Sequence, residues 1–421
     1  MKKMWIAAWL AALALVAGCN HSGHGQNTTQ MRALNGSVDS EPLDVLVDTD
    51  VKVSALAFGA TSTYSEFDSG TRDVQVRSST NQSILSDHSV SFASGIQSTL
   101  LIYGHRAALQ SQLLTDDITA ISSGHLRVRI ANLAPDSGPV DLYISQGSFS
   151  STPVIISNAT YGTVTGSAEI SPGSLQITLT TAGTQDVLFQ STAQTFSQGS
   201  YVTILVLPSL GGKLVSAVML TQGGDGVFLQ NPFARLKAVN DIPATTLNFK
   251  VDNANLLLNV PYTGSSSYVT TNSGSHTVQV EQSNVPGTII ASSPQNLASA
   301  RDYSVMSVGT AAAAQLVVLP DDNTLPNGAS AKIRFVNGIN DGSAVDVLLN
   351  FASQVSALPF TNQSSYYQVA PSTSYTITFT TAGGVTVIST LTPVELDAGG
   401  VYSAYLLGTL AAPTIRVVRD R

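Results

Sequence analysis

The stretch from Leu126 to Ile144, LRVRIANLAPDSGPVDLYI, decides the fold, because degenerate copies of it recur three more times along the chain. Each copy contains a basic residue that is followed three positions later by an asparagine. The four pairs are Arg32 with Asn35, Arg129 with Asn132, Lys237 with Asn240, and Arg334 with Asn337. The asparagines are spaced by 97, 108 and 97 residues (132 − 35, 240 − 132 and 337 − 240), and this period indicates repeated structural units.

Further landmarks keep the same register in every copy. The first is a strand with an acid or its amide, at Asp44, Asp141, Asn248 and Asp346, and the second is an aromatic residue, at Phe58, Tyr161, Tyr262 and Phe360. A turn and an alternating strand follow, and a last strand opens at Gln97, Tyr201, Tyr303 and Tyr402. The shared register predicts four domains of roughly 90 to 100 residues, a size at which a domain can fold alone.

Composition narrows the class of protein. The 421 residues are 43% hydrophobic and only 11% charged, and the formal net charge is −8. An acidic chain without clusters of Lys and Arg lacks the features expected for binding nucleic acid or the surface of an anionic membrane. The single cysteine, Cys19, excludes disulfides within the chain, CxxC redox sites and cysteine-type zinc sites.

The N-terminus has the parts of an export signal. Lys2 and Lys3 precede a short apolar run, which ends in Val16-Ala17-Gly18-Cys19. This ending resembles the lipobox of bacterial lipoproteins. The resemblance implies cleavage between Gly18 and Cys19, a diacylglycerol on the Cys19 sulfur and acylation of its amine, and several acyl chains hold a protein to a membrane durably. The alternative is ordinary secretion with an incidental cysteine.

The residues after the cysteine suggest where the protein is held. Asn20 stands where an aspartate would resemble the inner-membrane retention signal of Gram-negative lipoproteins, so the outer membrane is expected. Residues 19–30 have no apolar periodicity and are predicted to form a flexible tether. We therefore expect a cell-envelope protein that is anchored through lipid on Cys19.

The body of the chain predicts strands and no helix of useful length. Leu43, Val45 and Val47 alternate with Asp44 and Asp48, as in a strand with one core face and one wet face. The predicted fold is all-β, with four tandem immunoglobulin-like β-sandwich domains of about seven strands each. They follow a signal peptide (1–18) and the tether, and they span residues 31–115, 125–221, 233–320 and 331–421, with linkers between them.

The second unit carries a family resemblance. RVRIANLAPDSGPVDLYI, the pair Tyr161-Gly162, the turn Ser171-Pro172-Gly173-Ser174 and the strand LQITLTTAG together resemble the bacterial family called domain of unknown function 4397. The match is best in the second unit and clear in the fourth, whereas the first and third units lack the Ala-Pro-Asp. The resemblance covers most of residues 31 to 421. It implies exported tandem β-sandwich modules, often on lipoproteins, and no assigned activity.

Residues that carry chemistry are scarce. None of the six histidines lies in an HExxH motif, and the chain has neither GxSxG nor SxxK, so no catalytic, cofactor or metal site is expected. His21 and His24 in the tether are interpreted as solvated linker residues rather than weak metal ligands. The clustered acids are interpreted either as solvated turns or as calcium ligands in the linkers. They are Asp44, Asp48 and Asp50; Asp116 and Asp117; and Asp321, Asp322 and Asn323.

The repeated polar residues receive structural roles. The basic residue and the acid lie on the predicted wet face, so Arg129 and Asp141 are expected to pair across the sheet, which would stabilise by about 0 to 1 kcal/mol. The repeated asparagine is expected to satisfy backbone groups of a turn. The repeated tyrosine is interpreted as a core aromatic rather than a tyrosine corner. Phe149, in a polar loop inserted between Ser145 and Pro153, is a candidate partner contact.

Three classes of function remain. The first is a non-enzymatic, lipid-anchored envelope protein whose modules form a structural, scaffold or adhesive array. The second is a lipoprotein that binds glycans or peptides through loops between strands. The third class is an enzyme, and it is the least favoured because four similar units share no reactive residue. The oligomeric state is left open.

Overall fold

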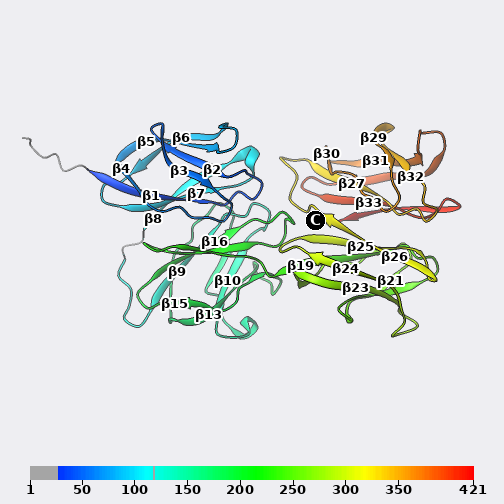
Figure 1. The fold of residues 1–421 in the computed structure, drawn as a ribbon, viewed down its shortest axis with the longest axis horizontal. Coiled ribbons are helices and arrows are strands. Elements are labelled where there is room, and N and C mark those ends of the chain that lie inside the picture. The colour runs from blue at the N-terminus through cyan, green and yellow to red at the C-terminus, as the bar shows by residue number, and fades with distance from the viewer. Residues whose placement is uncertain (1–26, 117–118) are drawn as a thin grey trace, which may run out of the picture.

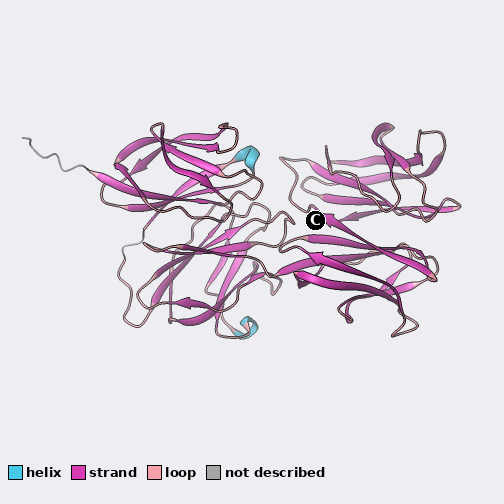
Figure 2. Ribbon diagram, viewed as in Figure 1, coloured by secondary structure: helices cyan, strands magenta, loops and turns pink. Residues whose placement is uncertain are grey.

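The computed structural model describes residues 27–116 and 119–421. Cys19, and with it the predicted cleavage and lipidation sites, lies outside the described residues, as do His21, His24 and Asp117. The regular secondary structure of the described residues consists of strands and two single-turn helices, η1 (Arg106–Ala108) and η2 (Phe149–Ser151) (Figure 2). No helix among the described residues has the length and apolar character needed to cross a membrane.

Module 1, the first sandwich, has eight strands in two sheets. Their bounds are β1 Thr28–Asn35, β2 Leu43–Val47, β3 Asp50–Leu56, β4 Ser65–Asp68, β5 Gly70–Ser78, β6 Ile84–Phe92, β7 Gln97–Tyr103 and β8 Gln110–Thr115. One sheet has the order β4-β1-β7-β8, with β1 and β7 parallel, and we call it the pairing sheet. The other has the order β3-β2-β5-β6, and we call it the outer sheet.

Modules 3 and 4 repeat this arrangement strand for strand. Module 3 has β19 Phe233–Asn240, β20 Thr246–Val251, β21 Ala254–Pro261, β22 Val269–Asn272, β23 Gly274–Gln282, β24 Ile289–Leu297, β25 Asp302–Thr310 and β26 Ala313–Asp321. Module 4 has β27 Ala331–Asn337, β28 Val345–Leu349, β29 Ala352–Leu358, β30 Tyr367–Val369, β31 Ser372–Thr381, β32 Val387–Leu396, β33 Val401–Thr409 and β34 Ala412–Arg419.

Module 2 keeps the plan with ten strands. They are β9 Leu126–Asn132, β10 Val140–Ser145, β11 Ile156–Ala159, β12 Ala168–Ile170, β13 Gly173–Thr181, β14 Val187–Gln190, β15 Gln194–Phe196, β16 Tyr201–Leu207, β17 Ser216–Thr221 and β18 Gly226–Leu229. β14 and β15 both pair with β13 and together take the place of one strand, and β18 extends the pairing sheet. The predicted sandwiches are confirmed, with eight or ten strands each instead of about seven.

Two predicted boundaries need correction. Thr28 to Gln30, assigned to the flexible tether, belong to β1, because they pair with Glu66 to Asp68 of β4. The predicted linker at 222–232 contains β18, which pairs with β17 and places Phe228 against Phe58 of module 1, with ring centroids 5.9 Å apart. Both segments gain backbone partners that sequence alone does not reveal.

Each module has its own apolar core, and a second layer of apolar contact joins the modules in pairs. Modules 1 and 2 pack pairing sheet against pairing sheet, and modules 3 and 4 do the same (Figure 1). The first contact buries Leu34 and Leu101 against Leu205 and Leu207, and the second buries Met306 against Tyr405. The pairing sheets are therefore buried on both faces, and the wet face predicted for these strands is wrong.

Candidate functional site

The repeated basic residue lies in the contact between paired modules. Arg32, Lys237 and Arg334 are almost completely buried, at 2%, 1% and 0% exposure. Arg129 is on β9 of the pairing sheet, whereas Asp141 is on β10 of the outer sheet, so the two do not share a sheet. The predicted pairing across one sheet is therefore wrong, because sequence neighbours were assumed to be sheet neighbours.

Modules 3 and 4 exchange buried ion pairs. Arg334 of module 4 pairs with Asp321 at the end of module 3, and Lys237 of module 3 pairs with Asp420 at the end of module 4. Burial works to raise the pKa of Asp321, but the attraction of Arg334 and of Lys237 outweighs it and holds the pKa below its usual range. Arg334 also donates to Ser403 at 2.8 Å, and Ser403 donates to Asp420, which makes one continuous network.

Modules 1 and 2 make the same exchange with backbone acceptors. Arg32 donates to the carbonyl oxygen of Thr221 at 3.0 Å, at the end of β17 in module 2. Reciprocally, Arg129 donates to the carbonyl oxygen of Thr115 at 3.0 Å, at the end of β8 in module 1. In both pairs, the repeated cation of one module therefore contacts the C-terminal end of the corresponding strand of the other module, which is β8, β17, β26 or β34, or the residue that follows it.

The repeated aromatic residue also serves module pairing. Tyr161 of module 2 makes an edge-on contact with Tyr103 of module 1, with ring centroids 5.7 Å apart. A Cβ atom on Gly104 would lie 3.1 Å from the Tyr161 hydroxyl, so this glycine gives the ring room. Phe58 and Phe360 pack against the two inter-module clusters. The basic residue and the aromatic residue of the repeat thus specify contacts between modules.

The repeated acid or amide holds a β-bulge within each outer sheet. Its Oδ1 accepts the N–H of Ala55, Asn158, Asn259 and Ala357, at 2.9, 2.7, 2.9 and 2.7 Å in modules 1 to 4. The four residues that donate these N–H groups have positive φ angles of 49°, 55°, 55° and 51°. A bulge strains the strand and leaves its N–H unpaired, so a side-chain acceptor stabilises it.

The repeated asparagine does what the sequence predicts. Its Nδ2 donates to the carbonyl oxygens of Leu56, Ala159, Val260 and Leu358, in each case at 3.0 Å. Its Oδ1 accepts the N–H two residues ahead, at 2.9 to 3.1 Å. All four asparagines are 0% exposed, so the role in satisfying turn backbone is confirmed.

Two of the repeated tyrosines form corners. The hydroxyl of Tyr303 accepts the N–H of Ala298, and that of Tyr402 accepts the N–H of Asp397, both at 2.9 Å. A hydroxyl bonded to the backbone a few residues upstream is the arrangement of a tyrosine corner. The interpretation as a plain core aromatic is therefore wrong at these two positions.

Several of the clustered acids form ion pairs with Arg or Lys side chains of the protein. Asp321 is 1% exposed and paired with Arg334, so its interpretation as a solvated turn is wrong. Asp322 pairs with Lys332 at 3.1 Å, and Asp48 pairs with Arg72 at 3.0 Å. Across 27–116 and 119–421, no group of three or more His, Cys, Asp or Glu side chains is placed to hold a metal ion.

Phe149, the proposed partner contact, lies in η2 and is half-buried. Its ring packs edge-on against Tyr143 of the same module, with centroids 5.4 Å apart. Part of its apolar surface is thus used within module 2. Contact with a partner through Phe149 stays a prediction.

A charged junction ties three parts of the chain together. His105 of module 1 lies 3.3 Å from Asp136 of module 2 and 3.7 Å from Asp39 of module 1. The other oxygen of Asp136 accepts the N–H of Leu325, in the linker before module 4, at 2.8 Å. Hydrogen bonds to Asp136, then to Asp39, outweigh burial and raise the pKa of His105 to about 10.

This junction predicts a loss of stability at alkaline pH. The pKa of His105 is raised from 6.5 to about 10 on folding, so its stabilising effect is complete below about pH 6.5 and is lost as the pH rises through 10. We expect His105→Gln to cost on the order of 2 kcal/mol near pH 6 and little at pH 10. Urea unfolding at both pH values measures this. His125→Gln serves as the control, and an equal cost at both pH values would contradict the prediction.

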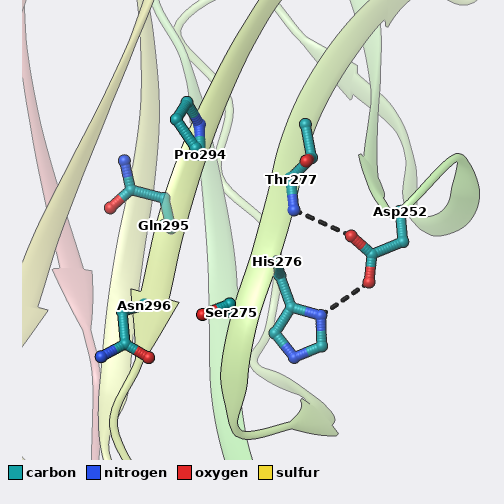
Figure 3. A pocket seen from close by; sticks show the side chains of 7 residues that line it. All are labelled: Asp252, Ser275, His276, Thr277, Pro294, Gln295 and Asn296. Atoms are coloured by element: carbon teal, nitrogen blue, oxygen red, sulfur yellow. Dashed lines mark hydrogen bonds and ion pairs between the residues drawn. The ribbon is translucent and has the colours of Figure 1, made fainter.

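A second polar site lies on module 3, in an open groove beside β23 and β24 (Figure 3). Asp252 is at the turn between β20 and β21, where it accepts the N–H of Thr277 at 2.8 Å and contacts Nδ1 of His276 at 2.7 Å. The first of these bonds, and then the second, lowers the pKa of Asp252. The sequence alone does not reveal this pair, because Asp252 and His276 are 24 residues apart and form no local motif.

The same turn in other modules shows that part of this site is structural. Asp48 in module 1 accepts the N–H of Asp73 at 3.0 Å and pairs with Arg72, and Asn350 in module 4 accepts the N–H of Thr376 at 2.8 Å. The turn residue therefore clamps the neighbouring strand in these modules. What distinguishes this turn in module 3 is the imidazole of His276, which takes the place of Arg72 in module 1 and Tyr375 in module 4.

Comparison with known proteins gives a family and no assigned activity. Residues 29–143, 234–347 and 331–421 match the family model described as "Domain of unknown function (DUF4397)". Residues 144–233 lie outside these matches, so the expectation that the second unit matches best is wrong; module 2 departs from the plan by its inserted loop, its divided strand and β18.

No curated protein matches the chain. Among solved structures, the product complex of SpuA, a multi-modular glycogen-degrading pneumococcal virulence factor, aligns at 9% identity with a TM-score of 0.17. The alignment covers 63% of this chain and 37% of that one, and at this TM-score it carries no argument. The family matches span more than half of the chain. The protein therefore belongs to the DUF4397 family of domains of unknown function.

Proposed function

We propose that the protein is a non-enzymatic, lipid-anchored scaffold of the cell envelope. The observation that carries the proposal is the reciprocal pairing of modules, in which the repeated basic residue makes the inter-module contacts. These residues are Arg32, Arg129, Lys237 and Arg334. Residues that recur in all modules are thus used to join the modules in two pairs. Each pair can present its two outer sheets to other envelope components.

Module pairing refines the form of the scaffold. A string of four sandwiches would be a long spacer, but modules 1 and 2 lie side by side, and so do modules 3 and 4 (Figure 1). The array is therefore two modules long and two modules wide. A platform suits this shape better than an extended arm.

The use of the repeated polar residues supports a non-enzymatic role. The repeated acid holds a bulge, the repeated asparagine holds a turn, and the repeated cation joins modules. His276 has an orienting carboxylate, but the described residues supply no hydroxyl or thiol bonded to it. His88 Nε2 lies 2.7 Å from the Ser111 hydroxyl, but its Nδ1 lies 3.4 Å from the Ser86 hydroxyl rather than bonding a carboxylate. Nucleophilic catalysis needs a hydroxyl or thiol bonded to a base that a third group orients.

Replacing Cys19 with alanine tests the anchor. We expect the variant to lose incorporated palmitate and to leave the membrane fraction, because its apolar signal alone is too short to span a bilayer. Asn20→Asp is the matched control, which should keep the lipid and move the protein from the outer to the inner membrane. An unlabelled wild-type protein, or a Cys19→Ala variant that stays with the membrane, would contradict the proposal.

A second candidate function is binding of a glycan or peptide at the envelope. The observation that favours it is the open polar groove of module 3, which lies on strands rather than on the predicted loops. Protease accessibility in intact cells distinguishes a surface-facing protein from a periplasmic one.

A further inference from the structure

We propose that Lys237 of module 3 and Asp420 at the end of module 4 join through an amide bond, which links the two modules covalently. Lys237 lies on β19 and Asp420 directly follows β34, so the bond ties the first strand of module 3 to the end of the last strand of module 4. The inference goes beyond the scaffold proposal. It rests on the contact between modules 3 and 4 and not on the lipid anchor.

Module 3 is the unit whose repeated basic residue can act as a nucleophile. The equivalent residues of modules 1, 2 and 4 are Arg32, Arg129 and Arg334. A guanidinium group does not lose its proton in proteins, whereas the amine of a lysine, once it has lost its proton, attacks a carbonyl carbon. The lysine in module 3 therefore brings a reactive amine to a position where the other modules have none.

The two reacting groups are in direct contact at a site closed to solvent. Nζ of Lys237 is bonded to Oδ1 of Asp420, and the two side chains are 1% and 0% exposed. Tyr268 and Tyr405 cover the amine, with ring centroids 5.2 and 5.5 Å from Nζ. A fixed contact replaces an encounter between separate molecules and so lowers the barrier to bond formation. The exclusion of water then protects the product from hydrolysis.

The hydrogen bonds of Lys237 favour an amide over an ammonium group. An ammonium group has three N–H donors, but among the described residues Nζ has one hydrogen-bond acceptor, Asp420. The two tyrosine rings offer their faces in place of oxygen acceptors. An amide nitrogen carries a single N–H, so bond formation removes two donors that a buried site would otherwise have to satisfy.

The charges of the network stay balanced after the reaction. Before it, the cations Lys237 and Arg334 face the carboxylates Asp420 and Asp321. The amide removes one charge of each sign and leaves the pair of Arg334 with Asp321. Since buried charges are costly even when they are paired, the exchange of one ion pair for a neutral amide relieves that cost.

The reaction needs no further reactant. Burial works to lower the pKa of Lys237, but the electrostatic effects of Tyr405 and Asp420 outweigh it and raise the pKa, so the pair starts out ionised. Transfer of one proton from Nζ to Oδ1 gives an amine and a carboxylic acid. The lone pair of Nζ then forms a bond to Cγ, the bond between Cγ and Oδ1 breaks, and Oδ1 leaves as water with the transferred proton and a second proton from Nζ. The amide keeps Oδ2 as its carbonyl oxygen and one hydrogen on Nζ.

The groups around Asp420 suit this step. Ser403 donates to Oδ2, the oxygen on which negative charge develops during attack on Cγ. Arg334 donates to Ser403 at 2.8 Å and so polarises its hydroxyl. Donors that are already aimed at such an oxygen lower the barrier. A cavity beside the pair, lined by residues 265–268 and 418–420, can receive the released water.

Mass spectrometry of the purified full chain after digestion with trypsin tests the inference. Trypsin does not cut after an acylated lysine, so residues 236–250 should stay in one peptide. We expect this peptide to be joined to residues 420–421, with a mass lower than the sum of the two peptides by one water. Fragmentation should place the link at Lys237 and Asp420.

Lys237→Arg is the matched control, because the other three modules have arginine at this position and because it keeps a cation for Asp420. This variant should yield neither the linked peptide nor the loss of water. A wild-type digest in which trypsin cuts after Lys237 and no linked peptide occurs would show an ion pair only and overturn the proposal. A loss of water that persists in the arginine variant would place the dehydration elsewhere and would also overturn it. Either failure leaves the scaffold proposal standing, because an ion pair still joins the modules.

Discussion

Replacing Arg334 with alanine is expected to destabilise the pair of modules 3 and 4 by about 3 to 5 kcal/mol. Arg334 is 0% exposed, and its guanidinium group bonds Asp321 and Ser304 of module 3 as well as Ser403 of its own module. Without it, Asp321 keeps a buried charge with Lys237 as the nearest compensation. Removing one partner of a buried ion pair is costly chiefly because the other charge is left uncompensated.

Urea unfolding, followed by the far-ultraviolet circular dichroism of the strands, measures the effect. Arg419→Ala is the matched control: Arg419 pairs with Asp397 at 2.7 Å in the same module, but the two side chains are 52% and 46% exposed. An exposed pair is worth only about 0 to 1 kcal/mol. Equal costs for the two variants would show that the inter-module network does not stabilise the pair.

A great deal of each module could be predicted from sequence. The alternation of Val74 and Val76 with polar neighbours predicts an outer-sheet strand, and both valines are 0% exposed. Asn35 and its three counterparts were correctly placed at a turn, because a short amide two residues before a free N–H has few other uses. These features are local, and local chemistry is what a single sequence records.

Module pairing was missed although the sequence carries a signal for it. The strand Ser98-Thr99-Leu100-Leu101-Ile102 is continuously buried rather than alternating, as is Val202 to Leu207 in module 2. Continuous apolar strands indicate a sheet that is covered on both faces. The identity of the covering surface is a contact between distant segments, which no period within one module reveals.

The candidate site was missed for a related reason. The sequence places His276 in no known motif, and Asp252 belongs to none of the acid clusters that the sequence shows. Their contact is made by strand register, which brings the turn after β20 beside the start of β23. The repeated turn acid at Asp48 is the one sequence feature that would have pointed to the Asp252 position.

The stability of modules 3 and 4 is also expected to fall as the pH rises from about 4 to about 8, because of Asp241. This residue is 0% exposed, and none of the ion pairs among the described residues includes it. It accepts the N–H of Gly408 of module 4 at 2.7 Å, and Asn340 donates to its carbonyl oxygen at 2.8 Å. Burial raises its pKa from 3.8 to about 8, and the Gly408 bond opposes this only in part.

A pKa that is higher in the folded state means that the folded protein keeps a proton which the unfolded chain releases. The contribution of Asp241 is therefore complete below pH 3.8 and is lost as the pH rises through 8, at about 1.4 kcal/mol per pH unit between the two values. Asp241→Asn, which stays neutral and keeps an acceptor for Gly408, should remove this slope and exceed the wild type in stability by several kcal/mol near pH 8.

Urea unfolding between about pH 5 and pH 9 measures this difference in stability, with Asp341→Asn in an exposed loop as the control. Because the other titrating groups, including His105, remain in every variant, only the difference between Asp241→Asn and the wild type isolates this carboxyl. Parallel pH profiles for the two would mean that Asp241 is ionised within the interface and that another group must compensate its charge.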